Sequence, residues 1–257
     1  MRERLRRPVT YGMAPLARAG VVTPQRFVIY CPPRTGSSLL ASLFDSHPSV
    51  RCEGELLAKK VPRPLAWFDG RSAHARLQGQ LVWGCKVISQ HLRWFPEAYG
   101  EGDQLLRDLV ERDYKLIVLR RRDWLLQALS AAHAVRTQYH FTSDEPTCFS
   151  AMRVDPVEVL SLLLTMEQED AIVASSVADL PHLELWYEDD LRTPDRQQRA
   201  LDRLTEELGI ERATVSSRYV SVAPPSFAGR VANADEVAEL IASTRFAPFL
   251  DRQAYER

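Results

Sequence analysis

The sequence has almost no net charge, few cysteines and no long apolar run. Its 33 Lys and Arg residues nearly balance 34 Asp and Glu residues, and a formal charge of −1 gives no field for holding a nucleic-acid backbone. No segment reaches roughly 18 consecutive apolar residues, and the first residues lack the apolar stretch of a signal peptide. We therefore expect a cytoplasmic protein that neither inserts into membranes nor binds nucleic acid.

The four cysteines show neither a C-x-x-C pair nor the spacing of metal ligands, so we expect reduced thiols and no metal site. They are Cys31, Cys52, Cys85 and Cys148. There is also no internal repeat and no low-complexity block. We expect a flexible N-terminal segment over residues 1–24, followed by one domain over residues 25–257, a length that can bury one substantial core.

Short apolar runs alternate with helical patterns along the chain. Strands are expected at Arg26–Cys31, Leu81–Ile88, Tyr114–Leu119 and His182–Tyr187. Helices are expected at Ser37–Ser46, Phe95–Arg112, Asp123–Arg136 and Pro156–Val177, with a further one starting near Ala234. This alternation predicts an α/β fold whose parallel sheet is flanked by helices and binds ligands beyond the carboxyl ends of its strands. The segment 54–80, with two prolines and Gly70, is expected to be an acceptor-binding loop.

A candidate anion site follows the first predicted strand. The segment Pro32–Leu40, PPRTGSSLL, lies between a strand and a helix, where backbone N–H groups converge on a phosphate. Gly36 permits close backbone approach, Ser37 and Ser38 add hydroxyl donors, and Arg34 adds a fixed positive charge. A simple strand-to-helix turn capped by serine would have a similar sequence. The segment lacks the upstream glycine and the lysine of the P-loop pattern, which disfavours ordinary ATP or GTP chemistry.

A second candidate anion site lies at the end of the third predicted strand, which finishes in three arginines. Asp123, Gln127 and Ser130 follow at a spacing that puts them on one helix face. An arginine at a strand end and a serine two turns into the next helix can hold a phosphate together. A solvated helix start is the alternative.

The first of these motifs, Pro33-Arg34-Thr35-Gly36-Ser37-Ser38, resembles the 5′-phosphosulfate loop P-[KR]-[ST]-G-[ST]-[ST] of the sulfotransferase superfamily. Its arginine and its Leu-Leu ending are more similar to the bacterial carbohydrate-type branch that includes the mycobacterial trehalose sulfotransferase. The resemblance implies a P-loop-like phosphosulfate loop, 3′-phosphoadenosine 5′-phosphosulfate (PAPS) as the donor and 3′,5′-ADP as the product. It also implies that Thr35, Gly36, Ser37 and Ser38 bind the donor together with Arg34.

The same resemblance assigns the 3′-phosphate of PAPS to an arginine at the third strand end and a serine eight or nine residues later. Ser130 fits the serine. The arginine is Arg121 by the branch pattern R-x-D-x-x-x-Q-A-x-S and Arg122 by simple eight-residue spacing, so we assign Arg121 and keep Arg122 in reserve. Arg230, in a late loop that resembles the one closing over the nucleotide, is a further cofactor candidate. The segment Tyr187–Leu191, YEDDL, resembles a mainly structural element of the superfamily.

Sulfuryl transfer to an alcohol needs a base that removes the hydroxyl proton. By its distance from Gly36 and the two leucines after it, Glu55 resembles the base of the trehalose-type relatives, and Glu53 is the fallback. His91 and His133 rank below both. Lys86 interrupts an apolar strand and needs an anionic partner there, either the sulfuryl group or Glu55.

These motifs together predict a PAPS-dependent sulfotransferase that acts on a hydroxyl of a small acceptor, a carbohydrate or a natural-product scaffold. The alternatives are a kinase-like phosphotransferase that uses ATP and magnesium, and a nucleotide-binding regulator without turnover. A homodimer is left open. Six aromatic residues could stack on an acceptor; they are Trp67, Phe68, Trp94, Phe95, Tyr139 and Phe141.

Overall fold

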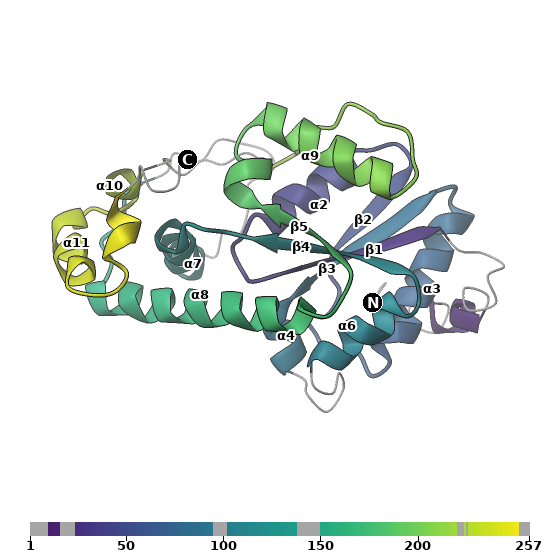
Figure 1. Cartoon of the computed structure of the whole chain (residues 1–257), viewed down its shortest axis with the longest axis horizontal. Coiled ribbons are helices and arrows are strands. Elements are labelled where there is room, and N and C mark those ends of the chain that lie inside the picture. The colour runs from purple at the N-terminus through teal and green to yellow at the C-terminus, as the bar shows by residue number, and fades with distance from the viewer. Residues whose placement is uncertain are drawn as a thin grey trace.

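The structure is a computed structural model that describes residues 10–15, 24–94, 102–137, 150–219, 224 and 226–251. At its centre is a five-stranded sheet in the order β2-β3-β1-β4-β5, in which all neighbouring strands pair in parallel (Figure 1). The strands are β1 (Gln25–Cys31), β2 (Val50–Glu55), β3 (Val82–Ile88), β4 (Tyr114–Arg120) and β5 (His182–Trp186). The predicted α/β domain with a central parallel sheet is confirmed.

Helices cover both faces of the sheet (Figure 1). One face packs against α2 (Ser37–Asp45) and α9 (Pro194–Glu207). The other face packs against α3 (Pro64–Leu77), α4 (Ser89–Trp94), α6 (Gly102–Val110) and α8 (Pro156–Val177). A third apolar cluster joins α8 to α7 (Trp124–Thr137), α10 (Phe227–Arg230), α11 (Ala234–Ala242) and the 3-10 turn Ala247–Leu250.

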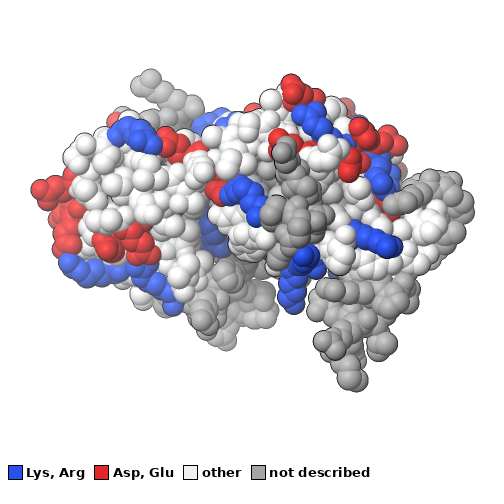
Figure 2. Space-filling model, turned by 90° about the horizontal axis from the view of Figure 1, so that it is seen from below, with Lys and Arg blue, Asp and Glu red and all other residues white. Residues whose placement is uncertain are grey.

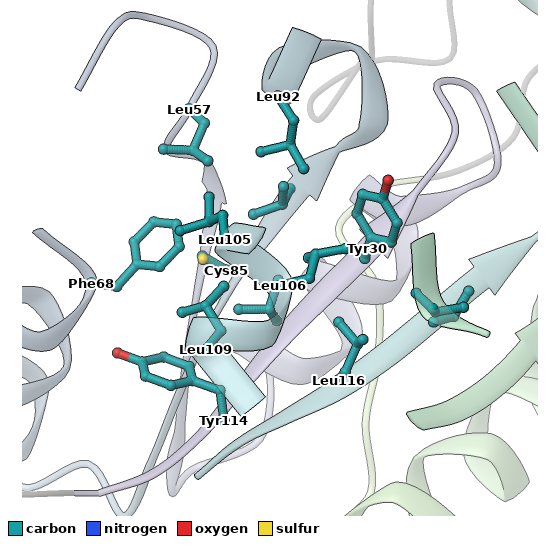
Figure 3. Packing of buried hydrophobic residues seen from close by; sticks show 14 of the residues in the cluster. Tyr30, Leu57, Phe68, Cys85, Leu92, Leu105, Leu106, Leu109, Tyr114 and Leu116 are labelled. Carbon is teal, nitrogen blue, oxygen red and sulfur yellow. The ribbon is translucent and has the colours of Figure 1, made fainter. Parts of the chain in front are cut away.

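The core forms because the strands are apolar on both sides. Every residue of β3 is buried, as expected for an inner strand of a parallel sheet with helices on both faces. Figure 3 shows one of the two sheet clusters, in which three leucines of α6 pack beside Phe68 of α3, Cys85 of β3 and Tyr114 of β4. Burial of this apolar surface is the main driving force that holds the helices on the sheet.

The prediction of a loop over residues 54–80 is wrong, because this segment contains the end of β2 and the whole of α3. Strand β2 lies at the sheet edge and has only two buried residues, Val50 and Cys52, so its apolar pattern is weak. Helix α3 contains Gly70, which resembles a loop signal. A Cβ at Gly70 would lie 1.8 Å from the Thr10 carbonyl oxygen, so glycine is required there by close packing.

The other predicted elements agree with the structure to within a residue at each end, with one exception. The predicted helix Phe95–Arg112 appears as α6 from Gly102 to Val110, and residues 95–101 lie outside the described part. Residues 10–15, within the segment predicted to be flexible, are helical, and the Tyr11 ring lies 5.5 Å from the Trp67 ring between centroids.

Two findings concern the described residues as a whole. None of their helices has both the length and the apolar character needed to cross a bilayer. In the face shown in Figure 2, basic and acidic side chains are interspersed, and they form no single basic stripe among the residues that the structure describes.

Candidate active site

The loop after β1 turns sharply into α2 at Gly36. Gly36 has a φ of 92°, a left-handed conformation that glycine adopts without steric cost. A Cβ here would also lie 2.7 Å from Cδ2 of the Tyr187 ring. The first hydrogen bond of α2 runs from Leu40 N–H to the Gly36 carbonyl at 3.1 Å, so the preceding N–H groups have no partner within the helix. Such groups at a helix N-terminus can bind an anion.

Arg34 links this loop to α7. Its φ of 63° is unusual for a residue with a side chain. Its Nε and Nη2 atoms donate to the Ser130 hydroxyl at 3.1 and 3.0 Å. One turn earlier on α7, Gln127 Nε2 donates to the Pro33 carbonyl at 2.7 Å. The structure therefore brings together Arg34 and Ser130, two residues from separate sequence motifs.

The three hydroxyl groups of the loop are all largely buried. Thr35 donates to the Pro32 carbonyl at 3.1 Å, which stabilises the turn. The Ser38 hydroxyl accepts a hydrogen bond from Lys86 Nζ at 2.6 Å. Thr35 thus has an internal role, and Ser38 links the start of α2 to Lys86 of β3.

The three arginines at the end of β4 have different partners. Arg120 Nη2 lies 2.5 Å from Oδ2 of Asp170 on α8. Arg122 Nη2 lies 2.6 Å from Asp189 in a pair whose two side chains are 36% and 50% exposed. Arg121 is only 8% exposed, and its Nη1 donates to the Arg34 carbonyl at 3.3 Å. The structure therefore places Arg121, and not Arg122, against the loop.

The guanidinium group of Arg121 is held by a π-helical turn, Tyr187–Leu191, that follows β5. Its Cζ lies 4.6 Å from the Tyr187 ring centroid, and its Nε lies 3.8 Å from Glu188 Oε1. The Nε atom is buried and has no hydrogen-bond partner among the described residues. The Glu188 carboxylate also accepts the backbone N–H groups of Arg122 and Asp123, each at 3.1 Å. Tyr187 and Glu188 thus fix the position of the Arg121 guanidinium, while its Nη1 contacts the loop.

Positive charges around the loop repel one another. Burial and the neighbouring Arg121 lower the pKa of Arg34. Burial, Arg34 and Arg230 lower the pKa of His133 on α7. Arg230 is held near this helix because its Nη1 donates to the Leu126 carbonyl at 3.4 Å. A phosphate bound here would relieve the repulsion, because opposite charge favours the charged form of each group.

A second polar cluster lies at the carboxyl ends of β2 and β3. Lys86 is 4% exposed, and its Nζ donates to Glu55 Oε1 at 3.1 Å in addition to Ser38. Nε2 of His91, at the start of α4, lies 3.6 Å from the other oxygen, Glu55 Oε2. Burial lowers the pKa of His91, which keeps its imidazole neutral near pH 7. The Glu55 side chain is 39% exposed, so a bound hydroxyl can reach its carboxylate.

A β-bulge separates the two candidate carboxylates. Glu53 pairs with Cys85 and Glu55 pairs with Lys86, with the irregularity between them. Cys85 and Lys86 are successive residues of β3 and point to opposite faces of the sheet. The side chains of Glu53 and Glu55, which pair with them, therefore also point to opposite faces. Arg71 donates to both oxygens of Glu53 at 3.0 and 2.6 Å. Both oxygens of Glu53 are therefore hydrogen-bonded to Arg71, whereas Glu55 lies beside Lys86.

Sequence reasoning ranked His91 low and assigned no contact to Tyr187 or Glu188. His91 follows Lys86 by five positions, a spacing that does not by itself predict that the His91 Nε2 atom lies 3.6 Å from Glu55 Oε2. The YEDDL segment was available as a signal, but its contacts with the loop and α7 depend on which strands are neighbours.

No family model matches the chain, and no curated protein matches it. Among solved structures, the sulfotransferase domain from the curacin biosynthetic pathway is similar over 89% of this chain and 83% of its own, with 13% sequence identity and a TM-score of 0.43. A likeness this remote carries no argument about activity.

Proposed function

We propose that this protein is a PAPS-dependent sulfotransferase. The observation that carries the proposal is the contact of two separate anion motifs at one edge of the sheet. Arg34 of the first motif binds Ser130 of the second, and Arg121 of the second binds the Arg34 carbonyl. Because β1 and β4 are parallel neighbours, the residues that follow them meet at the same edge.

PAPS carries charged groups on both its 5′ and 3′ oxygens, and the chain offers a cation for each. The backbone of Gly36, Ser37 and Ser38 and the guanidinium of Arg34 would hold the 5′ end. Arg121 and Ser130 would hold the 3′-phosphate, with Arg230 nearby. Arg122 remains in reserve, since its partner Asp189 is at the surface. The Arg34–Ser130 hydrogen bond would give way to contacts with the two phosphates.

PAPS supplies an activated sulfuryl group, and the polar cluster supplies the base. Glu55 would take the proton of the acceptor hydroxyl as its oxygen attacks the sulfur atom. The bond from sulfur to the 5′-phosphate oxygen breaks, and that oxygen leaves as part of 3′,5′-ADP. Arg34 would neutralise the charge of the leaving phosphate, and Lys86 would orient Glu55 through the contact at 3.1 Å.

The remaining parts of the proposal concern partners and place. The acceptor is a small hydroxyl compound, a carbohydrate or a natural-product scaffold, and nucleic acid is not a partner. The site needs no metal, since arginines and Lys86 supply the positive charge, so turnover in EDTA should equal turnover without it. A cytoplasmic location, membership of the trehalose-type branch and a homodimer remain predictions from the sequence.

Calorimetric titration with 3′,5′-ADP and with ATP plus magnesium, followed by a turnover assay with radiolabelled PAPS, tests the proposal. We expect 3′,5′-ADP to bind without metal, and Arg34→Ala and Ser130→Ala each to weaken it by about 1 to 3 kcal/mol. Arg136→Ala is the matched control, because Arg136 lies on the same helix but pairs with Glu158 at the surface. Tight binding of ATP with no response to 3′,5′-ADP would show a kinase-like protein instead.

A further inference from the structure

The aromatic residues that the sequence suggests for the acceptor differ in their surroundings. Phe68 is fully buried in the core cluster of Figure 3, and Trp67 packs against the same cluster. Trp94 is exposed at the end of α4. The other three lie outside the described residues; they are Phe95, Tyr139 and Phe141. The contacts that hold Glu55 are instead polar, and they lead back to the start of α2.

Lys86 is a cation buried on an inner strand of the sheet, and it has two partners. Its Nζ atom donates to the Ser38 hydroxyl at 2.6 Å and to Glu55 Oε1 at 3.1 Å. A buried ammonium group without such partners would carry a large free-energy penalty, because it has lost its hydration. The two partners differ, since Ser38 is buried whereas the Glu55 side chain is 39% exposed. The shorter and drier contact, the one with Ser38, therefore fixes where the ammonium lies.

Ser38 is itself held by the packing of α2 on the sheet. It is the second residue of this helix, and Leu40 and Leu43 of the same helix are buried in a cluster with residues of the strands. Glu55, in contrast, is the last residue of the edge strand β2 and comes directly after the bulge. The position of the carboxylate is thus set from α2, through Lys86.

The hydroxyl and the main chain of Ser38 have different tasks. In the proposed function, the backbone N–H groups at the start of α2 bind the donor. The hydroxyl oxygen instead accepts the hydrogen bond from Lys86. Removal of the hydroxyl alone would therefore disturb Lys86 and leave the donor-binding backbone in place.

We propose that Ser38 is a positioning residue for the base: its hydroxyl fixes the Lys86 ammonium, and the ammonium fixes the Glu55 carboxylate. This inference rests on the proposed sulfotransferase activity, and it gives Ser38 a second role besides the donor binding that the resemblance implies. One helix start then serves both halves of the reaction, because its main chain holds the donor while the Ser38 side chain sets the base. The carboxylate keeps the direction that it needs to accept the proton of the acceptor hydroxyl.

The first test is Ser38→Ala, which removes the hydroxyl and keeps the main chain. We expect kcat with PAPS to fall by about 10-fold, because a displaced base is a small geometric error at the reacting atoms. The KM for PAPS and the Kd for 3′,5′-ADP should change by less than about 3-fold, as for a contact that acts mainly in the transition state. The acceptor probes are 4-nitrophenol and methyl β-glucopyranoside, with water as the acceptor when neither is added.

Ser42→Ala is the matched control. Ser42 is a buried serine one turn later on α2, and its hydroxyl accepts the Arg218 N–H at 3.1 Å. The variant loses a buried serine hydrogen bond that does not involve Lys86, so kcat should stay within about 2-fold of the wild type. An equal loss of kcat in Ser38→Ala and Ser42→Ala would show general damage to α2 and would overturn the proposal.

The second test asks whether Ser38 acts through Lys86. In a Lys86→Met background, and in a Glu55→Gln background, Ser38→Ala should change kcat by less than about 2-fold, because a group that Ser38 positions is already gone. A full further loss in these backgrounds would show that the hydroxyl acts on the donor directly, and the positioning role would be wrong. The Glu55→Gln background serves alone if Lys86→Met does not fold, which calorimetry with 3′,5′-ADP reveals.

The two proposals fail in different ways. If 3′,5′-ADP binds and PAPS is consumed but Ser38→Ala keeps the kcat of the wild type, the positioning role is wrong and the sulfotransferase proposal stands. If 3′,5′-ADP does not bind or PAPS is not consumed, both proposals fall.

Discussion

Glu53 and Glu55 are two positions apart in the chain and have opposite surroundings. Glu53 accepts hydrogen bonds from Arg71 and from Trp83 Nε1, the latter at 2.9 Å, and its side chain is 10% exposed. Glu55 faces Lys86 and His91 and is 39% exposed. The first carboxylate is thus suited to holding the fold and the second to exchanging a proton with a ligand.

Glu55→Gln keeps the size of the side chain but cannot accept a proton. We expect turnover to fall by roughly 10²- to 10⁴-fold. Affinity for 3′,5′-ADP should not change, since the loss concerns the transition state. Steady-state kinetics and calorimetry measure the two quantities.

The matched variant is Glu53→Gln. It should lower the free energy of unfolding in urea by about 1 to 3 kcal/mol, because Arg71 loses its charged partner, while turnover of the folded protein stays near that of the wild type. A normal turnover in Glu55→Gln together with a loss in Glu53→Gln would reverse the assignment. Full activity in both variants would indicate that neither glutamate is the base, and His91 or His133 would be the next candidate.

Arg121 and Arg122 make a second matched pair. Arg121→Ala removes a buried guanidinium beside the phosphate loop, and we expect the Kd for 3′,5′-ADP to rise by about 10- to 100-fold. Arg122→Ala removes a surface pair with Asp189 and should change the Kd by less than about 3-fold. Calorimetry with the two variants decides between them, and the opposite ranking would assign the 3′-phosphate to Arg122.

His133 provides a protonation signal for the same site. In the free protein its pKa is lowered from 6.5 by burial, Arg34 and Arg230. A bound nucleotide offsets the two arginines, so the pKa of His133 should rise on binding, and protonation should begin at a higher pH in the complex. By linkage, protonated His133 then strengthens binding as the pH falls. An NMR pH titration of the imidazole, assigned by the resonance missing in His133→Gln, should show this rise with 3′,5′-ADP; a fall or no change would place the nucleotide elsewhere.

At the scale of the element, the strand-to-helix turn at Gly36 is under two separate constraints. Its φ is positive, and Tyr187 occupies the place of a Cβ. Gly79, in the turn after α3, has a similar φ of 91° but nothing within 4 Å of a Cβ. The two glycines therefore share a left-handed backbone conformation, and only Gly36 has a neighbouring side chain in contact at the Cβ position.

Gly79→Ala should cost about 1 kcal/mol of unfolding free energy, the penalty for a left-handed conformation. Gly36→Ala should cost more, since Tyr187 must move, and the shift of Tyr187 should disturb Arg121 and weaken 3′,5′-ADP binding by about 10-fold or more. Urea denaturation and calorimetry measure the two effects. Equal stability losses with unchanged nucleotide affinity would show that the Tyr187 contact is unimportant.

Many elements were predictable from local pattern, whereas β2, α3, α4 and α9 were not predicted. Helix α8 begins at Pro156 after the capping Asp155 and ends at Val177 as predicted, because a proline start and sustained apolar spacing are local signals. Strand β2 was missed because an edge strand buries few residues. Helix α3 was missed because Gly70 looks like a loop residue. Glycine is required there by the close approach of the Thr10 backbone, which the sequence around Gly70 does not reveal.

At the scale of the whole molecule, the predicted parallel sheet implies that the two motifs, each following a strand, lie at its carboxyl-terminal edge, and the structure brings them into contact there. The loop after β1 and the arginines after β4 lie together because β1 and β4 are parallel neighbours. Resemblance and spacing favoured Arg121 over Arg122 and Glu55 over Glu53, but they do not decide either choice. Those choices depend on side-chain direction at a strand end and at a bulge, which neighbouring elements decide.

The central claim is that one nucleotide with phosphates at both its 3′ and 5′ positions binds across the two motifs. The most direct measurement is the calorimetric Kd of the wild-type protein for 3′,5′-ADP and for 5′-AMP under the same metal-free conditions. The two ligands differ only in the 3′-phosphate that Arg121 and Ser130 are proposed to hold. We predict that 3′,5′-ADP binds at least about 10-fold more tightly, the value of one charge-assisted contact. Equal affinities would contradict the account.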